Sequence, residues 1–325
     1  MRASLGSERP SNRVVTLGET MALVRTREIG SLRHVTELAL GIGGAESNVA
    51  IGLQRLGIDA GWLGCVGDDA LGERVARELR AEALDVRCVV DSAAPTGLMV
   101  KERSTSASTS VLYYRSGSAG SRLSPADIPS GWIEDAEVLH VSGITALVSE
   151  SARACVSEAV DRARAAGVRI SFDINYRSAL ADTDVAGSIL RWLADRADFV
   201  FGGADEMQLV RPGLNASEAA RAIAREGRRE VILKRGAEGA TVFIDDSVIE
   251  APGFIVEAVD TVGAGDAFVA GYLSAMLDGL SVSERLQRAN ACGALLCMSY
   301  GDWEGSPRRA DIERFRDAAA DPVTR

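Results

Sequence analysis

The chain has 325 residues, of which 46% are hydrophobic, enough for one large domain or two modest ones. Asp and Glu number 46 against 36 Lys and Arg, so the formal net charge is −10. This acidity argues against nucleic acid as the main partner, because phosphate backbones are bound through dense Lys and Arg. No apolar run is long enough to span a bilayer. A small phosphate ligand stays compatible, because it needs only local donors.

Cysteine and histidine usage narrows the setting. The five cysteines are odd in number and form no C-x-x-C pair, which favours a reducing, cytoplasmic location without a disulfide framework. With only His34 and His140, a zinc site is not expected. Residues 1–12 are polar and lack the apolar core of a secretory signal, so we expect a disordered leader there.

Strand and helix patterns alternate from residue 14 onward. Runs of apolar residues predict strands, and apolar residues spaced three and four apart predict helices. The predicted strands are 14–18, 60–69, 136–143, 168–175, 197–203, 229–236, 239–246 and 247–253. The predicted helices are 43–57, 70–84, 149–167, 184–196, 216–227, 264–279, 283–299 and 309–319. Such repeated strand–helix–strand units predict an α/β fold, a doubly wound and mainly parallel sheet with helices on both faces.

Residues 96–116 interrupt this alternation. TGLMVKERS and STSVLYYRS are rich in β-branched and aromatic residues, which predicts a hairpin. Together with about 21–40, this hairpin would form a small β lid outside the main sheet. Residues 13–316 are therefore expected to form a single domain with this lid, followed by a C-terminal tail over 317–325.

The stretch DTVGAGDAF (260–268) carries the main chemical signal. A helix starting at Gly263–Gly265 would offer free N–H groups to an anion, and Asp266 follows directly. A capped helix explains the acid equally well, because acids are common in the first turn. The alternative is a site where Asp266 takes a proton from a hydroxyl that attacks a phosphoryl group, while the amides hold the growing charge.

Other polar stretches are weaker signals. Paired glycines in LGIGGAESNVA (40–50) either present N–H groups to a polar molecule or only form a turn. Tyr113 and Arg115 share one strand face, which suits a ligand with hydroxyls and a carboxylate but is also typical of a solvated face. In SFDINYRSAL, polar residues at a spacing of two end a strand, namely Asp173, Asn175 and Arg177. This pattern is typical either of the wall of a binding site or of an exposed strand end.

With these residues in view, the chain resembles the ribokinase-like (PfkB-type) carbohydrate kinases over residues 13–316. GGAESNVAIGLQRLG (43–57) is similar to the family's N-terminal signature and DTVGAGDAFVAGYLSAML (260–277) to its C-terminal one. YYRSGSAGSRL and GDWEGSP resemble 2-keto-3-deoxygluconate kinases in particular. The resemblance implies ATP- and Mg²⁺-dependent phosphorylation of the C6 hydroxyl of that sugar acid. Fructose, tagatose or 2-keto-3-deoxygalactonate as the acceptor, or a non-catalytic sugar sensor, are the alternatives.

The resemblance also implies roles for single residues. Asp266 would be the catalytic base, with the anion hole formed by Gly263, Ala264 and Gly265. The sugar acid would contact Gly43, Gly44, Asn48, Tyr113, Arg115, Ile144, Arg177, Asp266 and Asp302. The nucleotide would contact Asn175, Arg177, Lys234, Arg235, Gly236, Gly239, Gly263, Gly265 and Asn290. Glu206 would help to bind the Mg²⁺ ion.

Three features depart from, or extend, the family pattern. Gly203 stands where the family's N-x-x-E motif has Asn, so only Glu206 of that motif is carried over. Met99 stands where some of these kinases have Tyr. Relatives also imply a monovalent cation such as K⁺ near Asp260 and Thr261, and a homo-oligomer, dimer or higher, formed through the lid, whose open sheet edge invites pairing.

Overall fold

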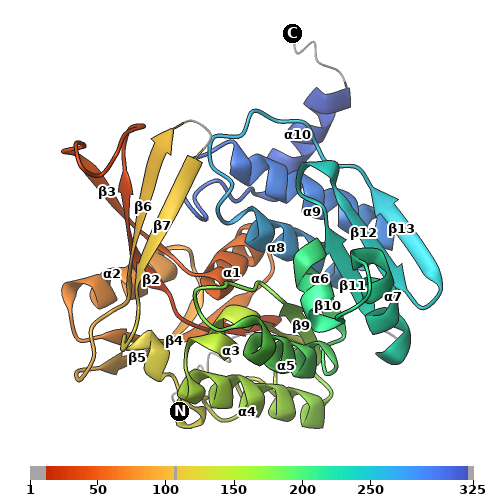
Figure 1. Ribbon diagram of the computed structural model, residues 1–325, viewed down its shortest axis with the longest axis horizontal. Coiled ribbons are helices and arrows are strands. Elements are labelled where there is room, and N and C mark those ends of the chain that lie inside the picture. The colour runs from red at the N-terminus through yellow and green to blue at the C-terminus, as the bar shows by residue number, and fades with distance from the viewer. Residues whose placement is uncertain (1–11, 106–107, 228, 321–325) are drawn as a thin grey trace, which may run out of the picture.

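The computed structural model describes residues 12–105, 108–227 and 229–320 (Figure 1). The predicted leader, apart from Asn12, and the last five residues of the predicted tail lie outside these ranges. Helix α10, Arg309–Ala320, includes the first residues of that tail. Among the described helices, none combines the length and apolarity that crossing a bilayer requires. All five cysteines are free.

A nine-stranded sheet forms the centre of the molecule, in the order β13-β12-β11-β10-β9-β8-β1-β4-β5. Its strands are β1 (Val14–Leu17), β4 (Ala60–Gly67), β5 (Asp85–Asp91), β8 (Val138–Ser142), β9 (Arg169–Asp173), β10 (Phe199–Gly202), β11 (Glu230–Lys234), β12 (Ala240–Ile244) and β13 (Ser247–Ala251). Neighbours pair in parallel, except that β12 pairs antiparallel with both β11 and β13. The chain order reverses at β1, and ligands of such sheets bind at the carboxyl ends of strands near that point.

Helices cover both faces of this sheet, as predicted. One face packs against α3 (Gly143–Val148), α4 (Glu150–Ala166), α5 (Thr183–Ala194), α6 (Ala204–Val210) and α7 (Ala216–Gly227). The other face packs against α1 (Ala45–Arg55), α2 (Ala70–Ala81), α8 (Ala264–Leu277) and α9 (Val282–Cys297). Two buried clusters of apolar side chains therefore sandwich the sheet, and α10 packs on α9.

The predicted lid is a separate four-stranded sheet in the order β3-β2-β6-β7. Its strands are β2 (Met21–Thr26), β3 (Leu38–Gly43), β6 (Leu98–Thr105) and β7 (Ser108–Tyr114). Figure 1 shows these four strands projecting together beyond the main sheet. One lid face is buried around Met21, Leu23 and Met99, with Val111 packed against them.

The sequence prediction missed three short elements. Strand β5 is an edge strand whose residues alternate little between buried and exposed, so it lacks the period-two pattern of a one-sided strand. Helices α3 and α6 have six and seven residues, too few to show a helical period of apolar residues. All three connect elements that the alternation had correctly identified.

Candidate active site

The first turn of α8 lies at the carboxyl edge of the main sheet. Gly263 is its N-cap with a left-handed φ of 83°, and a Cβ at this position would lie 1.9 Å from the carbonyl oxygen of Asp302. Conformation and space both require glycine there. The N–H of Ala264 donates to the carbonyl of Thr261 at 3.3 Å, whereas those of Gly265 and Asp266 have no preceding helical carbonyl to bond. The helix start thus presents a site for an anion.

Asp266 meets Asn48 because α1 and α8 approach very closely. A Cβ on Gly52 of α1 would lie only 2.7 Å from the Cβ of Ala270 on α8. One turn earlier in each helix, Asn48 Nδ2 donates to Asp266 Oδ2 at 2.8 Å. The two signature motifs, more than 200 residues apart, therefore form one site, with Asn48 orienting the carboxylate.

The pKa of the Asp266 carboxyl lies near neutral pH. Its pKa is raised from 3.8 to about 7. Burial is the main cause and Asp173 adds to it, while the Asn48 hydrogen bond, Lys234 and Arg177 act in the opposite direction. A general base works best when its pKa lies near the operating pH. Position and proton affinity both suit Asp266 to accept a proton at the helix start.

Lys234, at the end of β11, lies between the carboxylates and the helix start. Its Nζ is 2.7 and 2.8 Å from the two oxygens of Asp173, and 3.6 Å from the point where a Cβ on Gly265 would stand. Burial lowers the pKa of Lys234, but Asp173, Glu206 and Asp266 outweigh this and raise it. The side chain therefore stays a cation beside the anion site.

An apolar cavity of about 440 Å³ adjoins this cation. Its lining includes five residues that the sequence predicted for nucleotide binding, Lys234, Gly236, Gly239, Gly265 and Asn290, together with Phe254 and Phe268. Gly239 has a φ of 101°, and a Cβ there would meet the carbonyl of Ala251 at 2.1 Å, so the backbone turn needs glycine. Asn290 Nδ2 donates to the carbonyl of Pro252 at 3.0 Å.

The other residues predicted to contact the nucleotide are not part of the lining of this cavity. Arg235 turns its guanidinium toward Glu250, at 3.4 Å. Asn175 follows β9 with a left-handed φ of 38° and is buried, while Arg177 is exposed on the same loop. Arg177 influences the pKa of Asp266 through its charge.

Some of the predicted sugar-acid residues lie where the lid meets the start of α1. A Cβ on Gly43 would lie 2.4 Å from Met99 Cε and 2.7 Å from Asp302 Oδ2, so these three residues share one wall. A Cβ on Gly44 would strike the carbonyl of Glu19 at 2.3 Å, so the backbones touch there. Ile144 is the second residue of α3, and its N–H donates to Ser142 Oγ at 3.2 Å.

Arg115 and Tyr113 share one face of the lid, as the strand period predicted. The Arg115 Cζ lies 6.0 Å from the Tyr113 ring centre, and Tyr113 is about half exposed. Arg115 Nε and Nη2 bond the buried Glu19 Oε2 at 2.8 and 2.6 Å, and the Ser118 hydroxyl donates to Glu19 Oε1. Arg115 is thus held by a partner that the sequence reading had overlooked.

A model of the family described as pfkB family carbohydrate kinase matches residues 11–309. The chain belongs to this family. A 2-dehydro-3-deoxygluconokinase of Bacillus subtilis (strain 168) is 39% identical over 308 residues, covering 94% of this chain and 95% of that protein. A protein of the same name from Thermoproteus tenax is 34% identical over 311 residues, with 94% of each chain covered.

Solved structures agree. A putative ribokinase II from E. coli, crystallised with ATP and Mg²⁺, matches with a TM-score of 0.88 at 28% identity, over 94% of this chain and 99% of that one. The predicted family and ribokinase-like fold are confirmed. As a pfkB carbohydrate kinase, the chain is a phosphotransferase that uses an alcohol group as acceptor.

Glu206 has a structural task in this kinase. Its two carboxylate oxygens accept the N–H groups of Tyr176 at 2.8 Å and Gly203 at 2.7 Å, which caps α6. Within the described ranges, no group of three or more His, Cys, Asp or Glu side chains is arranged to hold a metal ion.

Sequence reasoning about this kinase also missed a signal in its lysines. Only two of its 36 basic residues are lysines, Lys101 and Lys234, and both are held by carboxylates at the site. Lys101 was read only as part of a hairpin. Its place two residues after Met99, on the inward face of the same strand, was the available clue.

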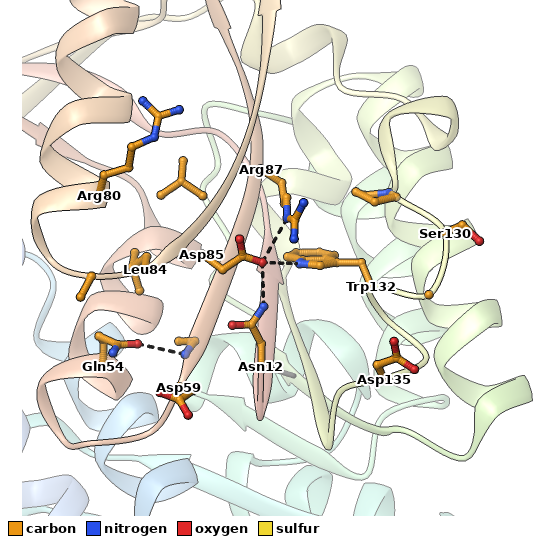
Figure 2. Close-up of a pocket in the computed structure, with 15 residues that line it drawn as sticks. Asn12, Gln54, Asp59, Arg80, Leu84, Asp85, Arg87, Ser130, Trp132 and Asp135 are labelled. Carbon is orange, nitrogen blue, oxygen red and sulfur yellow. Dashed lines mark hydrogen bonds and ion pairs between the residues drawn. The ribbon is translucent and has the colours of Figure 1, made fainter. Parts of the chain in front are cut away.

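A second, larger pocket lies at the opposite edge of the sheet. It has a volume of about 670 Å³ and opens where β4 and β5 begin, so it faces the amino ends of the strands. Figure 2 shows Asp85 at its centre, bonded to Asn12 at 2.9 Å, Arg87 at 3.1 Å and Trp132 at 3.2 Å. The pocket brings Asn12 next to β5, and its lining includes none of the residues around Asp266.

Proposed function

We propose that this kinase transfers the γ-phosphoryl group of ATP to the C6 hydroxyl of 2-dehydro-3-deoxygluconate, the 2-keto-3-deoxygluconate of the sequence analysis. One observation carries the chemistry. The buried Asp266, held by Asn48, lies in the first turn of α8, with Lys234 beside the same turn. A proton acceptor, a set of N–H donors and a fixed cation thus converge on one point.

These groups account for every bond that is made and broken in the phosphoryl transfer. As the hydroxyl oxygen bonds to the γ-phosphorus, its proton passes to Asp266, and the bond between that phosphorus and the bridging oxygen of ADP breaks. The N–H groups at the start of α8, with Lys234, stabilise charge on the transferring oxygens. Asn48 keeps the carboxylate turned toward the hydroxyl. The lid covers the site and excludes water, which limits ATP hydrolysis.

ATP and Mg²⁺ fit the residues present. The apolar cavity beside Lys234 suits an adenine ring, and a solved relative contains both ligands. Mg²⁺ commonly binds through phosphates and water instead of an all-protein cage, which agrees with the lack of a ligand cluster in the described residues. Asp173 and Glu206, whose charges both raise the pKa of Lys234, would reach the ion through water. When bound, Mg²⁺ neutralises phosphate charge.

A sugar acid is favoured over a neutral sugar by the arginine of the lid. Arg115 lies beside Tyr113 and places a positive charge near the proposed sugar site, although its guanidinium also pairs with Glu19. Two relatives that are 39% and 34% identical carry the name of the proposed activity. A 2-dehydro-3-deoxygalactonokinase of Haloferax volcanii is 32% identical, so the C4 epimer is the natural competitor.

An assay of ADP release over a panel of acceptors tests the proposal. The panel contains 2-dehydro-3-deoxygluconate, 2-dehydro-3-deoxygalactonate, fructose and tagatose, each with Mg·ATP. We expect the highest kcat/KM for 2-dehydro-3-deoxygluconate. Equal or better turnover of fructose would refute it, and binding of the sugar acid without any ADP release would show a sensor instead of a kinase.

Arg115→Ala should weaken sugar-acid binding far more than ATP binding. A hydrogen bond to a charged group contributes about 1.5–3 kcal/mol, so KM for the sugar acid should rise about 10- to 100-fold. KM for ATP should change little, because the guanidinium lies on the lid side of the site. Steady-state kinetics with each substrate varied in turn measure both values.

Glu19→Gln is the matched control for that variant. It removes the ion pair but leaves the guanidinium, so KM for the sugar acid should stay near the wild-type value or fall. If both variants raise this KM equally, Arg115 acts only through its pairing with Glu19. A larger effect of Arg115→Ala on ATP than on the sugar acid would show that the residue is wrongly assigned.

The outer face of the lid supports a homo-oligomer. Leu40, Val24, Val100 and Leu112 are successive partners across the four strands, so they form one apolar row on the face opposite Met99 and Lys101. Leu40 and Leu112 are 41% and 49% exposed. Light scattering should give at least a dimer, and Leu112→Asp should yield monomers. A monomeric wild type at micromolar concentration would contradict this part of the proposal. The proposed location of the kinase is the cytoplasm.

A further inference from the structure

Lys101 of the lid strand β6 reaches into the catalytic domain and ends between two carboxylates. Its Nζ lies 2.6 Å from Asp260 Oδ2 and 2.8 Å from Asp302 Oδ1. The three side chains are 5%, 7% and 6% exposed, respectively. Two carboxylates this close and this buried repel each other unless a cation separates them, and the ammonium supplies that cation.

Both carboxylates belong to loops that shape the site. Asp260 accepts the N–H of Val262 at 3.2 Å, so it braces the turn into Gly263. The carbonyl of Asp302 packs against Gly263, and the second oxygen of the same carboxylate, Oδ2, faces Gly43 on the sugar wall. The ammonium therefore holds one carboxylate that braces the turn into α8 and one that faces the sugar wall.

The choice of lysine is informative in this chain. Arginine supplies every other cation except Lys234, so a lysine at position 101 departs from the prevailing usage. A compact ammonium fits between two carboxylates where a planar guanidinium does not, and it is similar in size to a potassium ion. The sequence analysis expected a monovalent cation beside Asp260, and the ammonium of Lys101 occupies a position on that carboxylate.

We propose that Lys101 is a positioning residue that serves as a tethered monovalent cation, ordering the loops at 260–263 and 300–304 so that the kinase needs no exchangeable K⁺. This inference rests on the proposed function. It links the lid to the anion site, because β6 carries the cation that holds the turn before α8.

The wild-type enzyme provides the first test. Phosphorylation of the sugar acid is measured in potassium, sodium or tetramethylammonium chloride at constant ionic strength and constant Mg·ATP. We expect rates that agree within about twofold. If potassium accelerates the wild type tenfold or more, the inference is wrong, even though the proposed kinase function then stands. If no sugar acid is phosphorylated in any salt, the function fails instead.

Lys101→Met creates the complementary test. Loss of the ammonium should lower kcat at least tenfold and raise KM for the sugar acid, because Asp302 loses its orientation. Ammonium or potassium ions should restore activity at least fivefold over tetramethylammonium. They should also raise the melting temperature of this variant but not that of the wild type, a readout independent of turnover. No effect of these ions on either quantity would contradict the proposal.

Arg27→Met is the matched control, because it removes one exposed positive charge just after β2 of the same lid. Its activity and melting temperature should show no preference for ammonium or potassium. If Lys101→Met cannot be obtained folded, Lys101→Met/Asp302→Asn removes one of the two facing charges. The cation effect on its melting temperature then decides, with no effect counting against the proposal.

Discussion

Asp266→Asn is expected to lose nearly all turnover while it still binds both substrates. A positioned general base contributes about 10²- to 10⁴-fold, and asparagine cannot accept the proton. Its amide oxygen can still accept the hydrogen bond from Asn48, so the site should keep its shape. Rates of ADP release measure the loss, and calorimetric titration with the sugar acid measures binding. Turnover within tenfold of wild type would rule out Asp266 as the base.

The pH profile provides an independent control on that assignment. The base works only when ionised, and the pKa of Asp266 is raised to about 7. Wild-type kcat/KM should therefore fall about tenfold per pH unit as the pH drops below 7, and the residual rate of Asp266→Asn should lack this limb.

Stability should respond to the same carboxyl with the opposite sign. Its pKa rises from an ordinary 3.8 to about 7 on folding, so ionisation opposes folding increasingly between these two pH values. At pH 8, Asp266→Asn should thus melt at a higher temperature than the wild type.

Lys234→Met is expected to damage both stability and catalysis. Asp173 would become a buried, unpaired carboxylate, which costs about 3–5 kcal/mol of the free energy of unfolding. Loss of a fixed charge beside the transferring phosphoryl group should reduce kcat about 10²- to 10³-fold. The acidic limb of the pH profile should also move above pH 7, because Lys234 lowers the pKa of Asp266. Chemical denaturation and the pH dependence of kcat/KM measure these changes.

The double variant Asp173→Asn/Lys234→Met separates the two effects. With the facing carboxylate neutralised, the free energy of unfolding should return to within about 1 kcal/mol of the wild-type value, since position 173 no longer carries a buried, unpaired charge. Catalysis should stay low, because the cation is still missing. If activity returns together with stability, Lys234 has no part in phosphoryl transfer beyond holding Asp173.

Local patterns in the sequence were sufficient for the fold. Alternating strand and helix periods predicted the parallel sheet with two helical layers, and the β-branched hairpin at 96–116 predicted the second sheet. These features could be predicted because burial on one or both faces of an element imposes a period on its own residues. Elements too short or too exposed to show a period, such as α3, α6 and β5, were missed.

The two glycine-containing signatures likewise identified the family and the helix start that carries Asp266, because turn geometry and backbone donors are local properties. What surrounds that carboxylate was decided only by tertiary structure. Asn48 reaches Asp266 because Gly52 lets two helices touch, Lys234 is neutralised by Asp173, and Arg115 is shared with Glu19. In the sequence Lys101 was only one residue of a predicted hairpin. In the folded protein it contacts Asp260, in the loop before α8, and Asp302, in the loop after α9. Charges act through space and burial, so their pairing and their proton affinities depend on neighbours that are distant in the sequence and are set only when the chain is folded.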